Sequence, residues 1–225
     1  MSKRDRPSKQ RPPAPETVQS DWRLFLAVPL PAAVVELASG LIDDLAAEEW
    51  PVRWVAPGNA HLTLHFLGET PPERAELLRL ALGPVVARHA PFRLRTADLG
   101  VFPNQRRPRV LWLGLHGPAH RLAALHAALG ATLRAYDFPA EDSTGFHPHI
   151  TLGRVRDPVP RTLPNAIQRR FAEISAAGIV CAAVPRPVPV DEVVLVRSYL
   201  GKGPPRYEAV GCYPLGERAR SVTNG

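Results

Sequence analysis

The same four-residue pattern occurs twice in this chain and constrains its fold more than any other feature. It is His61-Leu62-Thr63-Leu64 in the first copy and His149-Ile150-Thr151-Leu152 in the second, 88 positions later (149 minus 61). In an extended strand alternate side chains share a face, so the histidine and threonine of each copy lie on one face and the aliphatic residues on the other. Each copy is therefore predicted to be a strand with one face in a hydrophobic core. The same alternation predicts that His65 joins His61 and Thr63 on the polar face.

Outside the two motifs, the apolar pattern changes between a helical and an extended period. Residues 31–50 and 118–133 place apolar side chains three and four positions apart, which indicates amphipathic helices. Further helices are predicted at residues 72–88 and 166–174, and strands at residues 22–30, 92–102, 110–115, 191–200 and 206–215. Because neighbouring strands are connected like hairpins, the chain is predicted to be an α+β protein with antiparallel sheet.

The charge of the chain is unevenly spread. The formal net charge is +7, and residues 1–20 contain five basic and two acidic residues, which leaves +4 on the remainder. This excess favours anionic partners but is too small to demonstrate nucleic-acid binding. The basic, proline-rich residues 1–20 are predicted to be a disordered tail, residues 21–216 a single domain and residues 217–225 a flexible C-terminus.

The expected compartment follows from three absences in the sequence. No apolar run approaches the ~20 residues that span a bilayer, and no apolar segment follows the basic N-terminus closely enough to form a secretory signal. The two cysteines, Cys181 and Cys212, have no metal-binding spacing and are interpreted as small buried hydrophobic residues. The chain is therefore expected to be cytoplasmic and monomeric, without a membrane partner.

Two histidines on adjacent strands supply what phosphodiester cleavage without a metal requires. If the two motif strands lie across a cleft, His61 and His149 converge on one point together with Thr63 and Thr151. One neutral imidazole can take a proton from the attacking oxygen while one protonated imidazole gives a proton to the leaving oxygen, and both forms exist near the reference pKa of about 6.5. Threonine hydroxyls can donate hydrogen bonds to phosphate oxygens, where negative charge grows. This chemistry needs no cofactor.

A zinc site is the alternative for two of these residues. His61 and His65 have a spacing that places two ligands on one face of a helix, but the local pattern is extended. No nearby Glu, Asp or Cys completes a tetrahedral ligand set, so no metal site is predicted. A single His-x-Thr in a strand most often reflects packing; its repetition, with leucine following each time, favours a functional interpretation.

The stretches HLTLHFLGE and HPHITLGR resemble the paired signatures of the 2H phosphoesterase superfamily. The stretches RLFLAVPLP, GVFPNQRRPRVLWLGL and VVLVRSYLGKGPPRYEAVGCYPL narrow the resemblance to the RNA 2',3'-cyclic phosphodiesterases, also called 2'-5' RNA ligases, over residues 22–216. The resemblance implies one bilobal domain, in which two antiparallel sheets with outer helices are related by a pseudo-twofold axis around a central cleft. It also implies metal-independent hydrolysis of an RNA or nucleoside 2',3'-cyclic phosphate to the 2'-phosphomonoester, with reversible 2'-5' ligation as a related activity.

Carried over by position, the resemblance assigns roles to the motif residues. His61 and His149 become the catalytic pair, with His61 as the acid that protonates O3' and His149 as the base that activates water, although a pseudo-symmetric site permits the reverse. Thr63 and Thr151 become donors to the phosphate oxygens.

Two further substrate-binding residues are expected beside the motifs. His65 stands where the family often has arginine or lysine, so a cation there would depend on pH. Arg154 follows the second motif and is expected to bind the phosphate, although strict alternation from His149 puts it on the opposite face unless the strand ends or bulges. Weaker candidates are Arg106, Arg107 and Arg109 for an RNA backbone, Phe146 for base stacking, Tyr207 beneath the cleft and His147 near the phosphate.

Two other functions remain open from the sequence. A nucleotide-binding module could keep the fold without the chemistry, although a pure binder has no need of both histidines. A phosphodiesterase for 2'-5' oligonucleotides or another cyclic phosphate would share the same catalytic residues and differ in its loops. The expected partners are RNA ends or nucleotides that bear a 2',3'-cyclic phosphate.

Overall fold

The computed structural model describes residues 21–56, 58–140, 145–179 and 185–216. The predicted tail, the predicted flexible C-terminus and Cys181 lie outside the described residues. The elements follow in the order β1 (Trp22–Val28), α1 (Ala32–Ala46), β2 (Val52–Trp54), β3 (Leu62–Thr70), α2 (Pro72–Val86), β4 (Phe92–Asn104), β5 (Arg107–His116), α3 (Ala119–Ala135), β6 (His149–Val155), α4 (Leu163–Ala176), β7 (Pro187–Val190), β8 (Glu192–Tyr199) and β9 (Arg206–Pro214).

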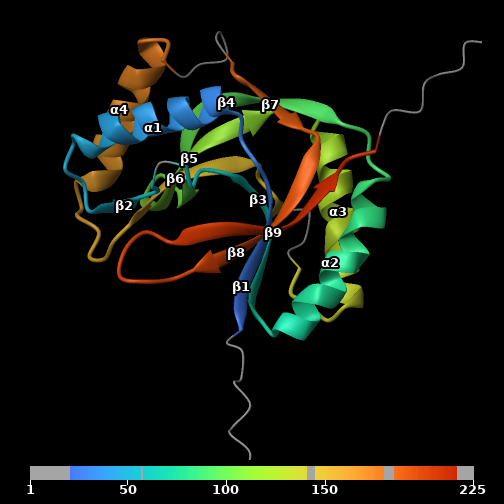
Figure 1. Cartoon of the computed structure of the whole chain (residues 1–225). Helices are drawn as coiled ribbons and strands as arrows, with labels where there is room; N and C mark the ends of the chain where they lie inside the picture. Colours follow the sequence, from blue (N-terminus) through green and yellow to red (C-terminus); the bar gives the residue numbers. More distant parts are fainter. Residues whose placement is uncertain (1–20, 57, 141–144, 180–184, 217–225) are drawn as a thin grey trace, which may run out of the picture.

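These strands form one strongly curled antiparallel sheet (Figure 1). Its order is β7-β4-β5-β6-β3-β1-β8-β9, with β2 paired to β6 beside this path. The α+β class and the antiparallel pairing are confirmed. The prediction of two separate sheets is wrong, because a pairing of Leu62 in β3 with Ile150 in β6 joins the two halves. Four strands of the main path lie on each side of this junction.

The junction between the two motif strands is short. Leu62 and Ile150 are the one aligned pair between β3 and β6, and β2 pairs with β6 farther along, where Trp54 is opposite Gly153. The two motif strands therefore meet near their beginnings and then diverge. Since the side chains of Leu62 and Ile150 are both fully buried, the junction is anchored in the core.

Helices cover the two halves of the sheet in pairs. α1 contacts β2 and β6 and α4 contacts β4, whereas α2 and α3 pack together, α2 against β8 and β9 and α3 against β3 (Figure 1). The helix faces are set by apolar spacing: in α1 the buried residues include Val34, Ala38, Leu41 and Leu45, three or four positions apart. The same hydrophobic cluster includes the aliphatic residues of both motifs, as the alternation predicted.

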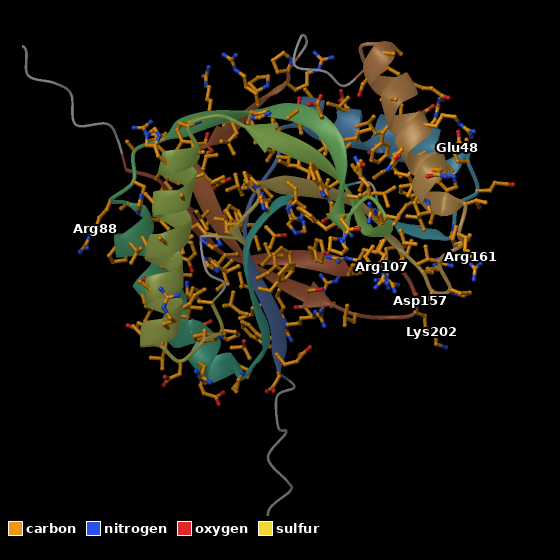
Figure 2. All side chains as sticks on the ribbon, turned by 180° about the vertical axis from the view of Figure 1, so that it is seen from behind. Glu48, Arg88, Arg107, Asp157, Arg161 and Lys202 are labelled. Atoms are coloured by element: carbon orange, nitrogen blue, oxygen red, sulfur yellow. The ribbon has the colours of Figure 1, made fainter. Side chains whose placement is uncertain are left out.

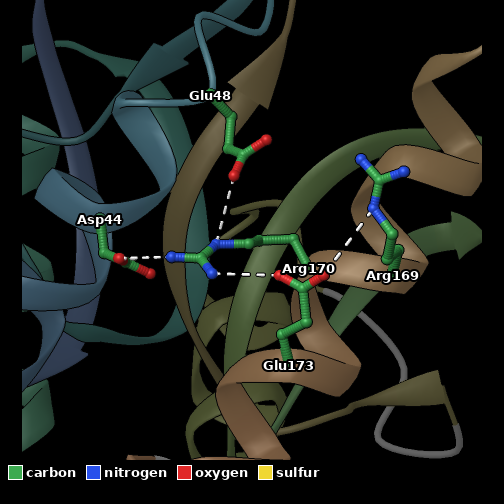
Figure 3. Close-up of polar contacts among 5 residues, drawn as sticks. All are labelled: Asp44, Glu48, Arg169, Arg170 and Glu173. Carbon is green, nitrogen blue, oxygen red and sulfur yellow. Dashed lines mark hydrogen bonds and ion pairs between the residues drawn. The ribbon is translucent and has the colours of Figure 1, made fainter.

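An arginine joins the two helices on the β6 side. Arg170 of α4 contacts Asp44 of α1, Glu48 just after α1 at 3.3 Å, and Glu173 on its own helix at 3.1 Å (Figure 3). The Arg170 side chain is about three-quarters covered, at 26% exposure, so it is less screened than an ordinary surface ion pair. The network fixes α4 to α1 and so holds the helical layer behind β6.

Several boundaries differ from the sequence predictions. The segment left between the predicted strands 92–102 and 110–115 is mostly strand. Asn104 accepts hydrogen bonds from the backbone N–H groups of Arg106 and Arg107 and turns the chain within two residues. β7 was not predicted; it holds two prolines and lies at the edge of the sheet, where a missing N–H is tolerated. Cys212 is exposed on edge strand β9, so its interpretation as buried is wrong. No helix of the described residues is long and apolar enough to cross a membrane.

Candidate active site

The register at the junction brings the two motifs together. Because β3 and β6 run antiparallel through the pair Leu62 and Ile150, extending the register by one residue aligns His61 with Thr151 and Thr63 with His149. Directly opposite residues on one face lie about 5 Å apart at Cβ. These four side chains project from the face opposite the buried leucine and isoleucine. Each histidine thus has the threonine of the other motif as its neighbour across the junction.

Both histidines are held by their own backbone in the same way. His61 Nδ1 lies 2.8 Å from the carbonyl oxygen of Asn59, and His149 Nδ1 lies 2.7 Å from that of His147. A carbonyl oxygen only accepts hydrogen bonds, so Nδ1 donates in both rings and carries the proton. In the neutral form Nε2 is then the basic nitrogen, and in the charged form Nε2–H is the acid. Both rings are therefore set to exchange protons through Nε2.

Aromatic side chains fix the ring planes. His61 stacks on Phe25 at 4.7 Å between ring centroids and meets the edge of Tyr207 at 5.5 Å. His149 lies edge-on to Phe102 at 4.9 Å, with Trp112 at 6.4 Å. Each catalytic candidate is thus supported by aromatic side chains from other strands, β1 and β9 for His61 and β4 and β5 for His149.

A β-bulge follows the threonine in both motif strands. Along β1 the register passes from Leu26 opposite His65 to Ala27 opposite Thr63, so Leu64 is the extra residue. Along β5 it passes from Leu111 opposite Gly153 to Trp112 opposite Thr151, so Leu152 is the extra residue. A bulge reverses the inside-outside alternation beyond it.

The first bulge removes His65 from the site. Its side chain is fully buried, and its Nε2 contacts the carbonyl oxygen of His126 in α3 at 2.9 Å, while its ring stacks on His126 at 3.9 Å. The prediction that His65 shares a face with His61 and Thr63 is therefore wrong. Its place is taken by Phe66, which is 49% exposed and lines the cavity beside His61.

The second bulge brings Arg154 into the site. With Leu152 as the extra residue, Arg154 returns to the face of His149 and Thr151 and lines the same cavity as His61. The equivalent of Arg154 in the first motif is Phe66, and the equivalent of His65 is Gly153. A side chain at Gly153 would collide with Val52 and Trp54, because an added Cβ would lie 2.5 Å from a Val52 methyl carbon.

A cavity of about 270 Å³ lies over this face of the sheet. It is lined by Arg23, Leu24, Phe25, Arg53, Val55, Asn59, His61, Thr63, Phe66, Gly68, Thr151, Arg154, Ser198, Leu200, Pro205 and Tyr207. All charged residues of this lining are arginines, so the cavity is suited to an anion. Asn59 also donates from its side chain to the carbonyl oxygen of Pro205 at 2.8 Å, which joins the loop before β3 to the loop before β9 at the cavity wall.

His149 does not line this cavity, although Thr151 and Arg154 of its strand do. It is nonetheless close enough to His61 for its positive charge to lower the pKa of the His61 imidazole. The two histidines are therefore electrostatically coupled across the junction, with His149 on the β4–β5 side of the site.

Burial is the main influence on His61. It lowers the pKa of His61 below 6.5; the Asn59 carbonyl opposes this, and the charges of His149 and Arg154 lower the pKa further. Burial also raises the pKa of Tyr207 above 10, although the charges of Arg154, Arg23 and Arg53 oppose the rise. The Tyr207 hydroxyl thus stays protonated at neutral pH and can donate a hydrogen bond at the cavity wall.

Several residues of the site were not singled out by the sequence. The sequence gives no role to Phe25, Phe66, Arg23, Arg53 and Asn59, and their place in the site is shown only by the cavity. Of the weaker candidates, His147 supplies its backbone carbonyl to His149. Phe146 stacks on the buried His126 at 4.1 Å. Within the described residues, no group of three or more His, Cys, Asp or Glu side chains is placed to hold a metal ion.

Comparison with known proteins agrees with this geometry. The model of the 2'-5' RNA ligase superfamily matches residues 24–202, which contain both motifs. A protein of Thermus thermophilus named RNA 2',3'-cyclic phosphodiesterase is 36% identical over 90% of this chain and 96% of its own length. A Geobacillus stearothermophilus protein with the same name is 33% identical over 85% of this chain, which spans only 56% of that longer relative.

Solved structures give the same result for the fold. The crystal structure of Escherichia coli LigT in its apo form superposes with a TM-score of 0.64 at 28% identity, over 88% of this chain and 100% of that one. LigT has also been crystallised in complex with 3'-AMP and with phosphate. The resemblance seen in the paired motifs is confirmed.

Proposed function

Because the chain belongs to the 2'-5' RNA ligase superfamily, we propose that it is an RNA 2',3'-cyclic phosphodiesterase that acts without a metal ion. The observation that carries this proposal is the matched pair of histidines, each with Nδ1 bound to the carbonyl two residues earlier, which makes Nε2 the nitrogen that exchanges the proton. The relatives named for this activity, at 33–36% identity, support the substrate class. The equal division of the main sheet path around the motif strands supports an approximate twofold relation between its halves.

The reaction is a displacement at phosphorus. His149 takes a proton from water at Nε2 as the water oxygen bonds to phosphorus, the P–O3' bond breaks, and His61 gives the proton on its Nε2 to O3'. The product is a 2'-phosphomonoester with a free 3' hydroxyl. Each histidine ends in the form in which the other began, so the pair is reset by proton exchange with solvent.

The threonines and Arg154 serve the phosphate. Thr63 and Thr151 lie opposite the histidines and can each donate a hydroxyl hydrogen bond to a non-bridging oxygen. Arg154 adds a permanent positive charge where the trigonal-bipyramidal transition state gathers negative charge. Phosphate and 3'-AMP bound to LigT support an anion-binding role for the equivalent site here.

Phe66 gives the cavity a second, apolar end. It is half exposed although it is a phenylalanine, and Leu200, at 66% exposure, also lines the cavity. An exposed aromatic face beside a phosphate site suits base stacking, which does not distinguish strongly between the four bases. We therefore assign Phe66 to the base of the terminal nucleotide.

The lowered pKa of His61 has a kinetic consequence for this assignment. As the acid, His61 must carry a proton, and in the free enzyme that proton is lost below pH 6.5. The alkaline limb of kcat/KM is therefore expected below pH 6.5, while an anionic phosphate in the site favours the protonated form and moves the limb of kcat upward. If His61 were the base instead, its pKa would govern the acidic limb.

The test is to incubate the purified protein with 2',3'-cyclic AMP and with a short RNA that ends in a 2',3'-cyclic phosphate, both with EDTA present. We expect the 2'-phosphate isomer as product and a loss of about 10³-fold or more in His61→Ala and His149→Ala. His120→Ala, at an exposed position on α3, is the matched control and should keep full activity. A 3'-phosphate product, dependence on a metal, or an active His61→Ala would each contradict the proposal; binding without turnover would indicate a binding module.

A second substrate separates the two histidine roles. Sulfur in place of O3' leaves as a thiolate and needs little help from an acid, since a thiol has a pKa near 8.5. His61→Ala should then recover much of its lost rate on this substrate, whereas His149→Ala should not. Recovery of His149→Ala alone would show that the two roles are reversed.

A further inference from the structure

Five arginines gather where β5 begins and β6 ends. They are Arg106, Arg107 and Arg109 from the β4–β5 hairpin, and Arg156 and Arg161 from the segment after β6. We call these five residues the arginine patch. Four of them line an open groove of about 520 Å³ together with Asp157 and the prolines of the segment after β6. Figure 2 shows Arg107, Asp157 and Arg161 on one side of the molecule and Arg88 on the other.

The patch accounts for the net charge of the chain outside its first 20 residues. Residues 21–225 contain 23 basic and 19 acidic residues; the patch and Asp157 contain five and one, so the remainder has 18 of each. Asp157 pairs with Arg109, and no ion pair of the described residues includes the other four arginines of the patch. These four arginines thus keep their charge available for a partner, and three of them, Arg106, Arg107 and Arg161, line the groove.

The patch continues the cationic line that starts in the active site. Arg154 lines the cavity and is opposite Arg53 on β2 and Val110 on β5. Three residues farther along the chain is Asp157, the partner of Arg109, and three residues of chain span at most about 10 Å. The patch is therefore within one or two nucleotides of a phosphate held at Arg154.

We propose that the arginine patch binds the phosphodiester backbone of a single-stranded RNA whose 3'-terminal cyclic phosphate occupies the cavity. The inference rests on the proposed function and names its substrate as an oligonucleotide rather than a mononucleotide. In a 2',3'-cyclic phosphate both ribose hydroxyls are esterified to the same phosphorus, so the rest of the chain can only extend from the 5' oxygen. Arginine matches the phosphate oxygens with paired N–H donors, and contacts of this kind carry no base preference.

Neutralising the three unpaired arginines that line the groove separates RNA binding from catalysis. The variant is Arg106→Gln, Arg107→Gln and Arg161→Gln, measured on 2',3'-cyclic AMP and on a five-nucleotide RNA ending in a 2',3'-cyclic phosphate. We expect kcat/KM for the RNA to fall about 10- to 30-fold at low salt, mainly through KM. The dependence of log(kcat/KM) on log salt should become shallower by about 2, at roughly 0.7 for each lost contact with a single strand. Turnover of the mononucleotide, which ends within the cavity, should change less than about twofold.

A matched variant removes the same charge elsewhere. The control variant combines Arg88→Gln, Arg93→Gln and Arg95→Gln. These three arginines are exposed near the start of β4, and none of them takes part in an ion pair of the described residues. This control should keep the RNA rate and its salt dependence. An equal loss in both variants would show a general effect of net charge, and an unchanged RNA rate in the patch variant would overturn the proposal.

Binding of the same RNA, with a non-reactive 2'-phosphate in place of the cyclic end, is measured by fluorescence anisotropy and does not depend on turnover. A protein that turns over neither substrate refutes the proposed function. The patch proposal then stands or falls on whether the patch variant, and not the control, weakens this binding.

Discussion

Protonation of His126 should destabilise this fold below pH 6.5. Its side chain is fully buried in α3 between the rings of His65, at 3.9 Å, and Phe146, at 4.1 Å. Burial, with the charge of His65 as the second cause, lowers the pKa of His126 from 6.5 to about 4, although the Leu64 backbone opposes the change. The stack thus holds a neutral imidazole directly behind the first motif strand.

The sign of the effect follows from proton counting. Between pH 4 and pH 6.5 the unfolded chain binds a proton at His126 that the folded chain does not, so the free energy of unfolding rises with pH. The contribution is complete above pH 6.5 and is lost as the pH falls toward 4. One pKa unit corresponds to about 1.4 kcal/mol, so the loss at pH 4 from this residue alone is about 3 kcal/mol. Most domains are stable by only about 5–15 kcal/mol in total.

The assay is urea unfolding followed by tryptophan fluorescence at several pH values from 4 to 7. His126→Phe keeps an aromatic ring in the stack and cannot be protonated. As the pH falls from 7 to 4, its free energy of unfolding should therefore fall by about 3 kcal/mol less than that of the wild type. The pKa values of His61 and His89, which burial also lowers, influence both proteins equally and cancel in the difference. His120→Phe, at an exposed position on the same helix, should keep the wild-type dependence. Parallel curves for the wild type and His126→Phe would refute the reasoning.

Three further changes test the site and its support. Arg154→Ala should lower kcat/KM about 100-fold through the loss of a charged hydrogen bond to phosphate, with part of the loss restored in Arg154→Lys; steady-state rates within twofold of the wild type would exclude the contact. Phe66→Ala should raise KM about tenfold at nearly constant kcat, whereas Phe66→Tyr, which keeps an aromatic ring, should leave KM unchanged. A change in kcat alone would argue against base stacking. Arg170→Ala should lower the free energy of unfolding, measured in urea, by about 1–2 kcal/mol without changing the rate of catalysis. Arg169→Ala, whose exposed pair with Glu173 spans 3.8 Å, should change the free energy of unfolding by less than about 0.5 kcal/mol. Equal effects would show that the partly buried position of Arg170 is unimportant.

The sequence is sufficient to predict which motif residues share a face because strand alternation is local. His61, Thr63, His149 and Thr151 share their face as expected, since no bulge interrupts either motif before its threonine. The residues beyond the threonine could not be placed in the same way. A bulge depends on the register of the neighbouring strand, which lies far away in the sequence, and this is why the alternation wrongly placed His65 beside His61.

The walls of the cavity depend on contacts that no single segment specifies. Arg23 is on β1, Arg53 on β2 and Tyr207 on β9, and they meet only because the sheet curls and the loop before β9 is bonded to Asn59. The pairing that merges the predicted two sheets into one is equally non-local, because Leu62 and Ile150 are the one aligned pair across the junction. The hydrophobic period predicted the helices better than the sheet, since each helix depends on a row of apolar side chains within its own segment.

The two bulges also explain how a duplicated motif can produce an oriented site. Histidine and threonine are the same in both copies, so the groups proposed for proton transfer and phosphate binding are nearly symmetric about the pair of Leu62 and Ile150. The next residue to face the site differs: it is Phe66 in one copy and Arg154 in the other. A substrate with a base at one end and further phosphates at the other can satisfy both only in one direction. If the chain binds RNA as proposed, that direction leads from Phe66, past the histidines, to Arg154 and the arginine patch, and the difference at a single repeated position would fix the polarity of the RNA.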